Sequence, residues 1–393
     1  MLNFATLNNP IMLVSDNPAL PGGLSRMCRD LATLCCTLPQ FRVAVLGRGI
    51  GNKRMFPFVL YDFPETCQWG EGYIQNSWEN FSEGQPGVIV TLDDQSRRHW
   101  FANPTGLPED LAKFLGTGRN FQKWMYLPLD STGPNGQTLS LQGLDCVSNY
   151  DRVLASSEWG RNVLARGGRT DADWLPHGFW GDKFHPVQNA RQLLGWKESD
   201  IWIGCVMANQ SRKDYPAAFE CFAALKKEYG NVLHCWVHTD ALIHYWNIPA
   251  LAAEYGVGEC LEVTSGLGDE QLGLRYSGCD VSVLPTAGEG FGYPILESLA
   301  CGTVCVTTDY AGGSELVEPS CRVHPVTYKV DTMHSVLRAV NSGYGFSEFA
   351  KLQIERKHSD PEYWSGKWAD SVSHLEWNRL KNLWTKWLLG GLK

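Results

Sequence analysis

The segment Glu289-Gly290-Phe291-Gly292-Tyr293-Pro294-Ile295-Leu296-Glu297 (residues 289–297) follows a short apolar run, Asp280–Leu284, and leads into an apolar helix. Pro294 suits the first turn of a helix, and Gly290 and Gly292 let backbone N–H groups approach a ligand closely. The N-terminus of such a helix favours an anion such as phosphate. The flanking carboxylates accept hydrogen bonds from sugar hydroxyls. The segment therefore favours a nucleotide sugar as ligand, against the alternative of an ordinary strand-turn-helix with a solvated glutamate.

A second polar segment, Asn209-Gln210-Ser211-Arg212-Lys213-Asp214, lies just past the apolar strand Trp202–Met207 and before a helix that begins at Tyr215. Adjacent cations at the carboxyl end of a strand are well placed to neutralise a diphosphate. A surface turn would look similar. Its occurrence in the same half of the chain as an anion-binding helix start favours the diphosphate.

Short apolar runs alternate with helical patterns along the whole chain, which predicts an α/β fold. We expect an N-terminal Rossmann-like domain at residues 1–186, a second at residues 187–358, and a helical tail at residues 359–393 that packs on the first domain. Parallel sheets place ligands beyond the carboxyl ends of their strands, so two facing domains would form a cleft there. The predicted strands are Ile11–Val14, Arg42–Leu46, Phe58–Tyr61, Val88–Thr91, Met125–Leu127, Arg152–Ala155, Ile201–Met207, Val232–Val237, Cys260–Val263, Asp280–Leu284 and Val304–Thr307.

The tail is rich in tryptophan and basic residues, and Trp377, Leu380, Trp384 and Leu388 share one helical face. One interpretation is an interfacial membrane helix with aromatic and basic sides. We favour the other, a terminal helix that buries its aromatic stripe against the protein, because one short helix on a net acidic chain is a weak anchor.

Composition bounds the function classes. The 393 residues carry a net charge of −8, so no overall basic field recruits nucleic acid or anionic membrane. No apolar run reaches about 18 residues, and the N-terminus lacks a signal-peptide pattern, which disfavours a transmembrane segment and secretion. The 13 cysteines show neither zinc-type nor regular disulfide spacing, which favours a reducing, cytoplasmic compartment.

The second half resembles the retaining glycosyltransferases of family 4, which have the two-domain GT-B fold. Their hallmark of two glutamates separated by seven residues corresponds here to Glu289 and Glu297. The resemblance covers roughly residues 125–320. Its further motifs are Asp151–Leu164 with Ser156-Ser157-Glu158, Leu175–Pro186, Arg191-Gln192-Leu193-Leu194-Gly195, Arg212-Lys213, Ser298-Leu299-Ala300-Cys301-Gly302-Thr303 and Ala311-Gly312-Gly313-Ser314-Glu315-Leu316.

The resemblance implies a role for each matching residue. Glu289 would contact donor-sugar hydroxyls, and Arg212 and Lys213 would bind the diphosphate; these three are the predicted catalytic residues. Glu297 would hold the ribose hydroxyls. The remaining predicted donor-binding residues are Gly290, Phe291, Gly292 and Tyr293 in the turn, Gly22 and Gly23 in a loop of the first domain, and Asn209. The sequence departs from the common pattern at Ala208, where an arginine is more usual, so Arg212 would substitute in a variant arrangement.

The family retains configuration by same-face attack, in which the leaving phosphate accepts the acceptor's proton, so no protein nucleophile is expected. We also expect no metal and no cofactor, with a UDP- or GDP-linked sugar as donor. In the first domain, Asp93, Asp94 and Asp130 follow predicted strands and are candidate acceptor residues; solvated turns are the alternative. Trp69, Trp78, Trp100 and Trp124 offer rings that stack on sugars or bases.

We therefore predict a retaining glycosyltransferase that moves a hexose-type sugar from a nucleoside-diphosphate sugar to a hydroxyl acceptor. The acceptor stays open among glycan, lipid, small molecule and modified DNA, and the oligomeric state is not predicted. One alternative is a virus-like enzyme acting on a hydroxymethylated base in DNA, for which Arg97-Arg98-His99-Trp100 and the tail rich in Trp and Lys would supply a basic, stacking surface. Others are a catalytically silent sugar-nucleotide-binding protein, and an epimerase or phosphorylase on the same fold.

Overall fold

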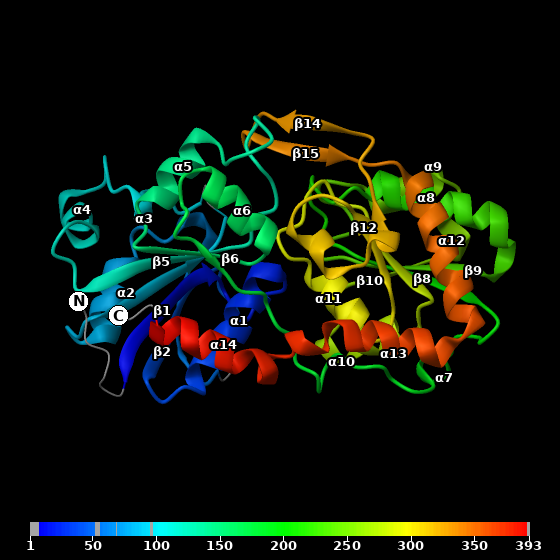
Figure 1. Cartoon of the computed structure of the whole chain (residues 1–393), viewed down its shortest axis with the longest axis horizontal. Coiled ribbons are helices and arrows are strands. Elements are labelled where there is room, and N and C mark those ends of the chain that lie inside the picture. Colours follow the sequence, from blue (N-terminus) through cyan, green and yellow to red (C-terminus); the bar gives the residue numbers. More distant parts are fainter. Residues whose placement is uncertain (1–7, 52–55, 68, 95–96, 391–393) are drawn as a thin grey trace. The chain divides into compact units, whose positions relative to one another are not determined.

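A computed structural model of the protein describes residues 8–51, 56–67, 69–94 and 97–390. The chain divides into a first unit, Met1–His177 with Leu380–Lys393, and a second unit, Gly178–Arg379. Each unit is built on its own parallel sheet with helices on both faces (Figure 1). The predicted α/β class with two Rossmann-like domains is confirmed.

The sheet of the first unit has seven strands in the order β3-β2-β1-β4-β5-β6-β7. All pairs are parallel, and β1 is buried from Asn9 to Ser15 because helices cover both faces of such a sheet. The strands are β1 (Asn9–Asp16), β2 (Phe41–Arg48), β3 (Val59–Phe63), β4 (Gly87–Leu92), β5 (Phe121–Leu127), β6 (Arg152–Ala155) and β7 (Asp173–Trp174).

The helices of the first unit follow the strands in alternation. The glycine turn before the first of them adopts a φ of 125° at Gly22, a conformation that glycine reaches without steric cost. The apolar stripe of that helix then packs on β1 and β2. The helices are α1 (Gly23–Cys36), α2 (Ile74–Ser82), α3 (His99–Ala102), α4 (Glu109–Leu115), α5 (Leu141–Ser148) and α6 (Glu158–Arg166), with a short 3-10 turn at Glu65–Cys67.

The C-terminal helix α14 (Trp377–Gly390) starts in the second unit and belongs to the first from Leu380 onward. Its aromatic stripe is buried in the protein. The Trp384 indole N–H donates to the carbonyl of Pro176 at 3.3 Å, and its ring packs edge-on against Tyr126 at a centroid distance of 5.1 Å. The prediction that a C-terminal helix returns to the first domain is confirmed.

The sheet of the second unit has six parallel strands in the order β10-β9-β8-β11-β12-β13, and a separate antiparallel hairpin, β14–β15, follows it. The strands are β8 (Ile201–Val206), β9 (Leu233–His238), β10 (Leu261–Thr264), β11 (Val281–Leu284), β12 (Cys305–Thr308), β13 (Arg322–Val323), β14 (Thr327–Asp331) and β15 (Val336–Val340). The helices are α7 (Ala190–Leu194), α8 (Tyr215–Tyr229), α9 (Ile248–Glu254), α10 (Asp269–Gly278), α11 (Tyr293–Ala300), α12 (Gly343–Ser359) and α13 (Pro361–Val372).

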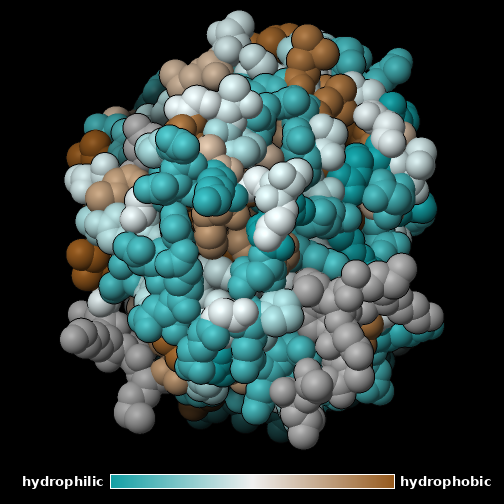
Figure 2. Space-filling view, turned by 90° about the vertical axis from the view of Figure 1, so that its left-hand side faces the viewer, coloured by the Kyte–Doolittle hydropathy of each residue, from teal (hydrophilic) through white to brown (hydrophobic). Residues whose placement is uncertain are grey.

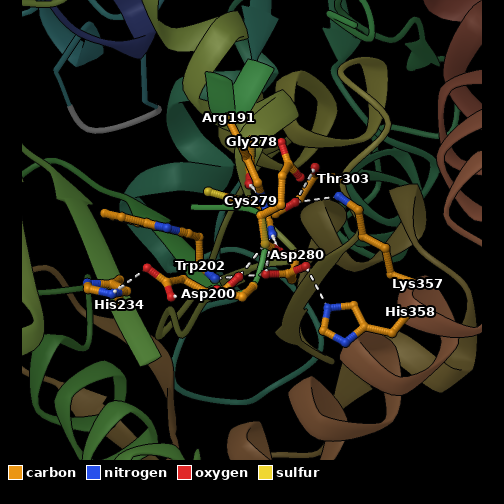
Figure 3. Close-up of polar contacts among 12 residues, drawn as sticks. Arg191, Asp200, Trp202, His234, Gly278, Cys279, Asp280, Thr303, Lys357 and His358 are labelled. Atoms are coloured by element: carbon orange, nitrogen blue, oxygen red, sulfur yellow. Dashed lines mark hydrogen bonds and ion pairs between the residues drawn. The ribbon is translucent and has the colours of Figure 1, made fainter. Parts of the chain in front are cut away.

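A buried carboxylate, Asp280, fastens two helices to the amino end of this second sheet (Figure 3). One of its oxygens accepts hydrogen bonds from the backbone N–H of Trp202 at 2.7 Å and from the guanidinium of Arg191 at 2.6 Å. Its other oxygen lies 3.0 Å from Nε2 of His358. Arg191 comes from α7 and His358 from α12, so the network is structural and lies at the opposite end of the strands from the predicted site.

Candidate functional site

The predicted donor segments of the second unit meet at the carboxyl ends of β8 and β11. These strands are neighbours where the sheet order reverses, the usual place for a ligand in such sheets. The backbone N–H of Asp214 donates to Pro285 at 3.1 Å, and that of Ala287 donates to Arg212 at 2.7 Å. A bridge between Lys213 and Thr286 completes the pairing. Segments more than seventy residues apart in the sequence thus form one loop pair.

At this loop pair the predicted catalytic residues are in direct contact. One carboxylate oxygen of Glu289 accepts a hydrogen bond from the Arg212 guanidinium at 3.1 Å and one from the Lys213 ammonium. Arg212 also donates to the carbonyl of Gly288 at 3.1 Å. The side chains of Lys213 and Glu289 are 6% and 13% exposed, so this charge cluster is shielded from water and its interactions are strong.

The glycine turn of residues 290–292 leads directly from Glu289 into α11. Gly292 takes a left-handed conformation, with φ 94° and ψ 67°, and its carbonyl accepts the first hydrogen bonds of the helix. Phe291 is buried, whereas Tyr293 is partly exposed. The arrangement presents the positive end of a helix beside the Glu289 cluster, as an anion requires.

A third loop, the 3-10 turn at Gly312–Leu316, holds Glu289 from the other side. The N–H of Gly313 donates to the carbonyl of Glu289 at 2.8 Å, and a Cβ added at Gly313 would lie 2.9 Å from Cβ of Glu289. A Cβ added at Gly292 would lie 3.3 Å from Cγ of the same residue. Gly312-Gly313 belongs to a motif of the family resemblance, but the sequence predicted no role for it. The signal was present, because paired glycines in a loop indicate close approach.

Two further predicted donor residues are buried in the second unit. Glu297 lies in the second turn of α11, 2% exposed. The Asn209 side chain donates to the carbonyls of Ala241 and Trp246 at 2.9 and 2.8 Å and accepts from the N–H of Trp246 at 2.8 Å. Asn209 therefore organises the loop after β9. Its predicted contact with the donor, like that of Glu297, stays a prediction.

The predicted residues of the first unit occupy separate places. Gly22 and Gly23 are exposed at the start of α1. Asp130 is partly exposed three residues after β5, and one of its oxygens accepts a hydrogen bond from the Ser131 hydroxyl at 2.9 Å. Asp94 is a half-exposed partner of Arg97, with 3.0 Å between carboxylate oxygen and guanidinium nitrogen.

Asp93 follows β4 and is fully buried. It pairs with Arg98, also fully buried, at 2.8 Å and with Arg97 at 3.2 Å. Burial raises the pKa of the Asp93 carboxyl to about 6, although both arginines oppose the shift. The sequence showed only two basic residues after a turn. Only the fold shows that Arg98 is an internal partner of Asp93.

The tryptophans proposed for stacking divide into two pairs. Trp78 and Trp124 are each 1% exposed and lie in the interior, so the expectation that they stack on a ligand is wrong. Trp69 and Trp100 are partly exposed. The guanidinium groups of Arg48 and Arg97 lie 4.6 and 4.8 Å from the centroid of the Trp69 ring.

Two properties of the described residues bear on the partner classes. Within residues 8–51, 56–67, 69–94 and 97–390, no three His, Cys, Asp or Glu side chains are grouped to hold a metal ion. Nor does any helix in the described part of the chain combine the length and apolarity needed to cross a membrane. Figure 2 shows the end of the first unit that carries α4, where the surface is mostly hydrophilic with small, scattered apolar patches.

Two Rossmann-like units, with a C-terminal helix shared between them, define a protein of the GT-B fold. The sequence similarity to a known protein family lies in the second unit. A segment of the second unit, residues 187–338, matches the family described as Glycosyl transferases group 1. It includes Arg212, Lys213, Glu289 and Glu297.

Proteins of known name are similar to this chain in part of the sequence and in the fold. A segment of 89 residues is 33% identical to an MMP alpha-(1->4)-mannosyltransferase of Mycolicibacterium hassiacum, and this match spans 22% of either chain. Sucrose-phosphate synthase of Thermosynechococcus elongatus superposes with a TM-score of 0.76 at 18% identity, over 98% of this chain and 99% of that one. Anabaena HepE, solved with UDP and glucose, superposes with a TM-score of 0.73 at 15% identity, over 98% and 100%. At these identities the structural likeness shows the fold alone.

Proposed function

We propose that the protein is a retaining family 4 glycosyltransferase that moves a hexose-type sugar from a nucleoside-diphosphate sugar to a hydroxyl acceptor. The observation that carries the proposal is the contact of Glu289 with Arg212 and Lys213 beside the N-terminus of α11. Cations, a helix N-terminus and a carboxylate together match a ligand with a diphosphate and a polyol part.

The two cations stabilise the leaving group in the proposed reaction. As the bond between the anomeric carbon and the phosphate oxygen breaks, negative charge develops on the nucleoside diphosphate. In this proposal Arg212, Lys213 and the α11 N-terminus offset that charge, and such preorganised electrostatics is usually the largest catalytic contribution. Because Lys213 is almost fully buried, little water screens it.

Glu289 has two tasks in this proposal. Its carboxylate accepts hydrogen bonds from donor-sugar hydroxyls, and it also contacts both cations that bind the diphosphate. The acceptor hydroxyl attacks the anomeric carbon from the face that the phosphate leaves, and its proton passes to the leaving phosphate oxygen. One C–O bond breaks and one forms, and configuration is retained because attack and departure occur on the same face.

The known proteins narrow the donor class. One matched relative is named a mannosyltransferase, and HepE was solved with UDP and glucose. We therefore propose a hexose donor carried on UDP or GDP. The thirteen cysteines are all free, and eleven of them are buried, which favours a reducing, cytoplasmic compartment.

The test is turnover of a panel of UDP- and GDP-linked hexoses, measured as release of nucleoside diphosphate. Lys213→Ala and Glu289→Gln should each lower kcat about 100-fold or more, because each removes a charge that acts on the reacting groups. Lys351→Ala removes a partly exposed lysine that pairs with Glu228 on α8 and should leave kcat unchanged.

Three outcomes would contradict the proposal. Neither turnover nor a thermal shift with any donor would exclude a nucleotide-sugar site. A thermal shift without turnover would make the protein a silent binding protein. A product of inverted anomeric configuration, determined by NMR of the glycoside formed, would exclude the retaining mechanism.

A further inference from the structure

The hairpin β14–β15 has an apolar face that its own unit covers only in part, because Ala339 is buried there but Tyr328 and Val330 are not. Tyr328 and Val330 alternate along β14 with Thr327, Lys329 and Asp331. Such alternation normally marks a strand whose apolar side packs on a core. Here the apolar residues are exposed by 45% at Tyr328 and 46% at Val330. Internal packing therefore leaves part of this face, at Tyr328 and Val330, open to solvent.

The cross-strand register makes this face continuous. Tyr328 pairs with Ala339 and Val330 with Leu337, so these side chains share one face, whereas Lys329 pairs with Arg338 on the opposite face. Val326, 68% exposed, extends the row beyond the strand. We call Val326, Tyr328, Val330 and Leu337 the apolar strip.

The apolar strip is joined to the proposed donor site. The Tyr310 hydroxyl donates to the carbonyl of Leu337 at 2.8 Å, and its ring lies 5.3 Å from that of Tyr328. Tyr310 directly precedes the loop in which Gly313 holds Glu289. The N–H of Ala339 donates to the carbonyl of Ala287 at 3.0 Å, two residues before Glu289. The hairpin is thus anchored to the same loops that carry the charge cluster.

We infer that the apolar strip binds an apolar chain or ring carried by the acceptor, which makes the natural acceptor an amphipathic hydroxyl compound rather than a plain sugar. This inference rests on the proposed function. Continuity with the donor loops favours a substrate over a macromolecule, because an acceptor must approach the anomeric carbon there.

Size favours the same occupant. Two five-residue strands at about 3.3 Å per residue and about 5 Å apart present on the order of 200 Å² on one face. A stable dimer buries roughly 800 Å² on each partner. The strip is therefore too small for a second copy of the chain and suits a single alkyl chain or ring.

The experiment compares n-octyl and methyl glycosides of one hexose as acceptors, with the donor that the panel identifies. For the wild-type protein we expect kcat/KM for the octyl glycoside to exceed that for the methyl glycoside by about tenfold or more, the effect of burying about two methylene groups. In Val330→Ser and Tyr328→Ala this ratio should fall below about threefold. Lys329→Ala, on the opposite face of the same strand, should keep the wild-type ratio.

The ratio separates the two hypotheses. If no donor turns over, the proposed function fails. If donors turn over but the wild-type ratio is near one, or if the strip variants keep the full ratio, the apolar strip does not bind the acceptor. Because Tyr328→Ala could also disturb folding, saturation-transfer NMR of the octyl chain with the wild-type protein and Val330→Ser gives a second reading. Vesicle binding or dimerisation that Val330→Ser abolishes, without any effect on the ratio, would assign the strip to a membrane or to a second copy.

Discussion

At the scale of single residues, the site depends on how tightly Glu289 is held. Two glycines from different loops, Gly292 and Gly313, lie against its Cβ and Cγ, leaving no room for a side chain at either position. The carboxylate then meets Arg212 and Lys213. The glycine contacts and the ion pairs thus fix the position of the Glu289 side chain, beside the N-terminus of α11.

Gly313→Ala tests whether the close contact with Gly313 holds Glu289 in position. The new Cβ would lie 2.9 Å from Cβ of Glu289, closer than two such atoms approach, so Glu289 must move. We expect kcat to fall at least tenfold, because small displacements of a catalytic group are costly. Gly366→Ala is the control, since a Cβ there meets nothing within 4 Å. Equal kcat in the two variants would show that the contact with Gly313 does not position Glu289.

At the scale of elements, α14 is an amphipathic helix whose apolar face is buried inside the protein. Its tryptophans match a membrane-surface helix in spacing, but they are buried in the protein, Trp384 and Trp387 within the first unit. The exposed side of the helix carries Leu383, 46% exposed. Tertiary packing therefore decides between two interpretations that the periodicity alone left open.

Trp384→Ala measures the contribution of this packing. Removal of a large buried ring that also donates a hydrogen bond to Pro176 should lower the free energy of unfolding by about 3–5 kcal/mol. Leu383→Ala, one residue earlier on the exposed side, should change it by less than about 1 kcal/mol. Urea denaturation followed by tryptophan fluorescence provides both values. Similar losses in the two variants would mean that the stripe is not the buried face.

At the scale of the whole molecule, the free energy of unfolding depends on pH through buried ionisable groups. His177 is 2% exposed and hydrogen-bonded to the Tyr126 hydroxyl at 2.6 Å. Burial lowers its pKa to about 3 from the ordinary 6.5. Below pH 6.5 the unfolded chain therefore binds a proton that the folded chain does not. Stability is complete above that pH and is lost as the pH falls toward 3.

The expected slope is about 1.4 kcal/mol per pH unit below pH 6.5, so the wild type should lose about 2 kcal/mol through this group between pH 7 and pH 5. His177→Gln lacks the titration. The difference in free energy of unfolding between the wild type and this variant, measured by urea denaturation, should therefore shrink by about 2 kcal/mol from pH 7 to pH 5. If the gap between the two proteins is the same at both pH values, folding does not lower the pKa of His177.

The sequence by itself determined the α/β class and the segments of the candidate donor site. Apolar runs identify strands because a parallel sheet is buried on both faces, and the Gly-Pro turn of residues 290–294 identifies a helix start because of backbone geometry. Arg212, Lys213 and Glu289 were recognisable as candidates because charges at strand ends are chemically conspicuous.

Only the tertiary structure decided which of these residues touch. The contact between Glu289 and Lys213 depends on β8 and β11 being neighbours in the sheet, which no local pattern encodes. The same holds for the burial of Trp78 and Trp124, and for the pairing of Asp93 with Arg98. Local periodicity reflects the backbone of one element, whereas contacts and burial depend on how distant elements pack together.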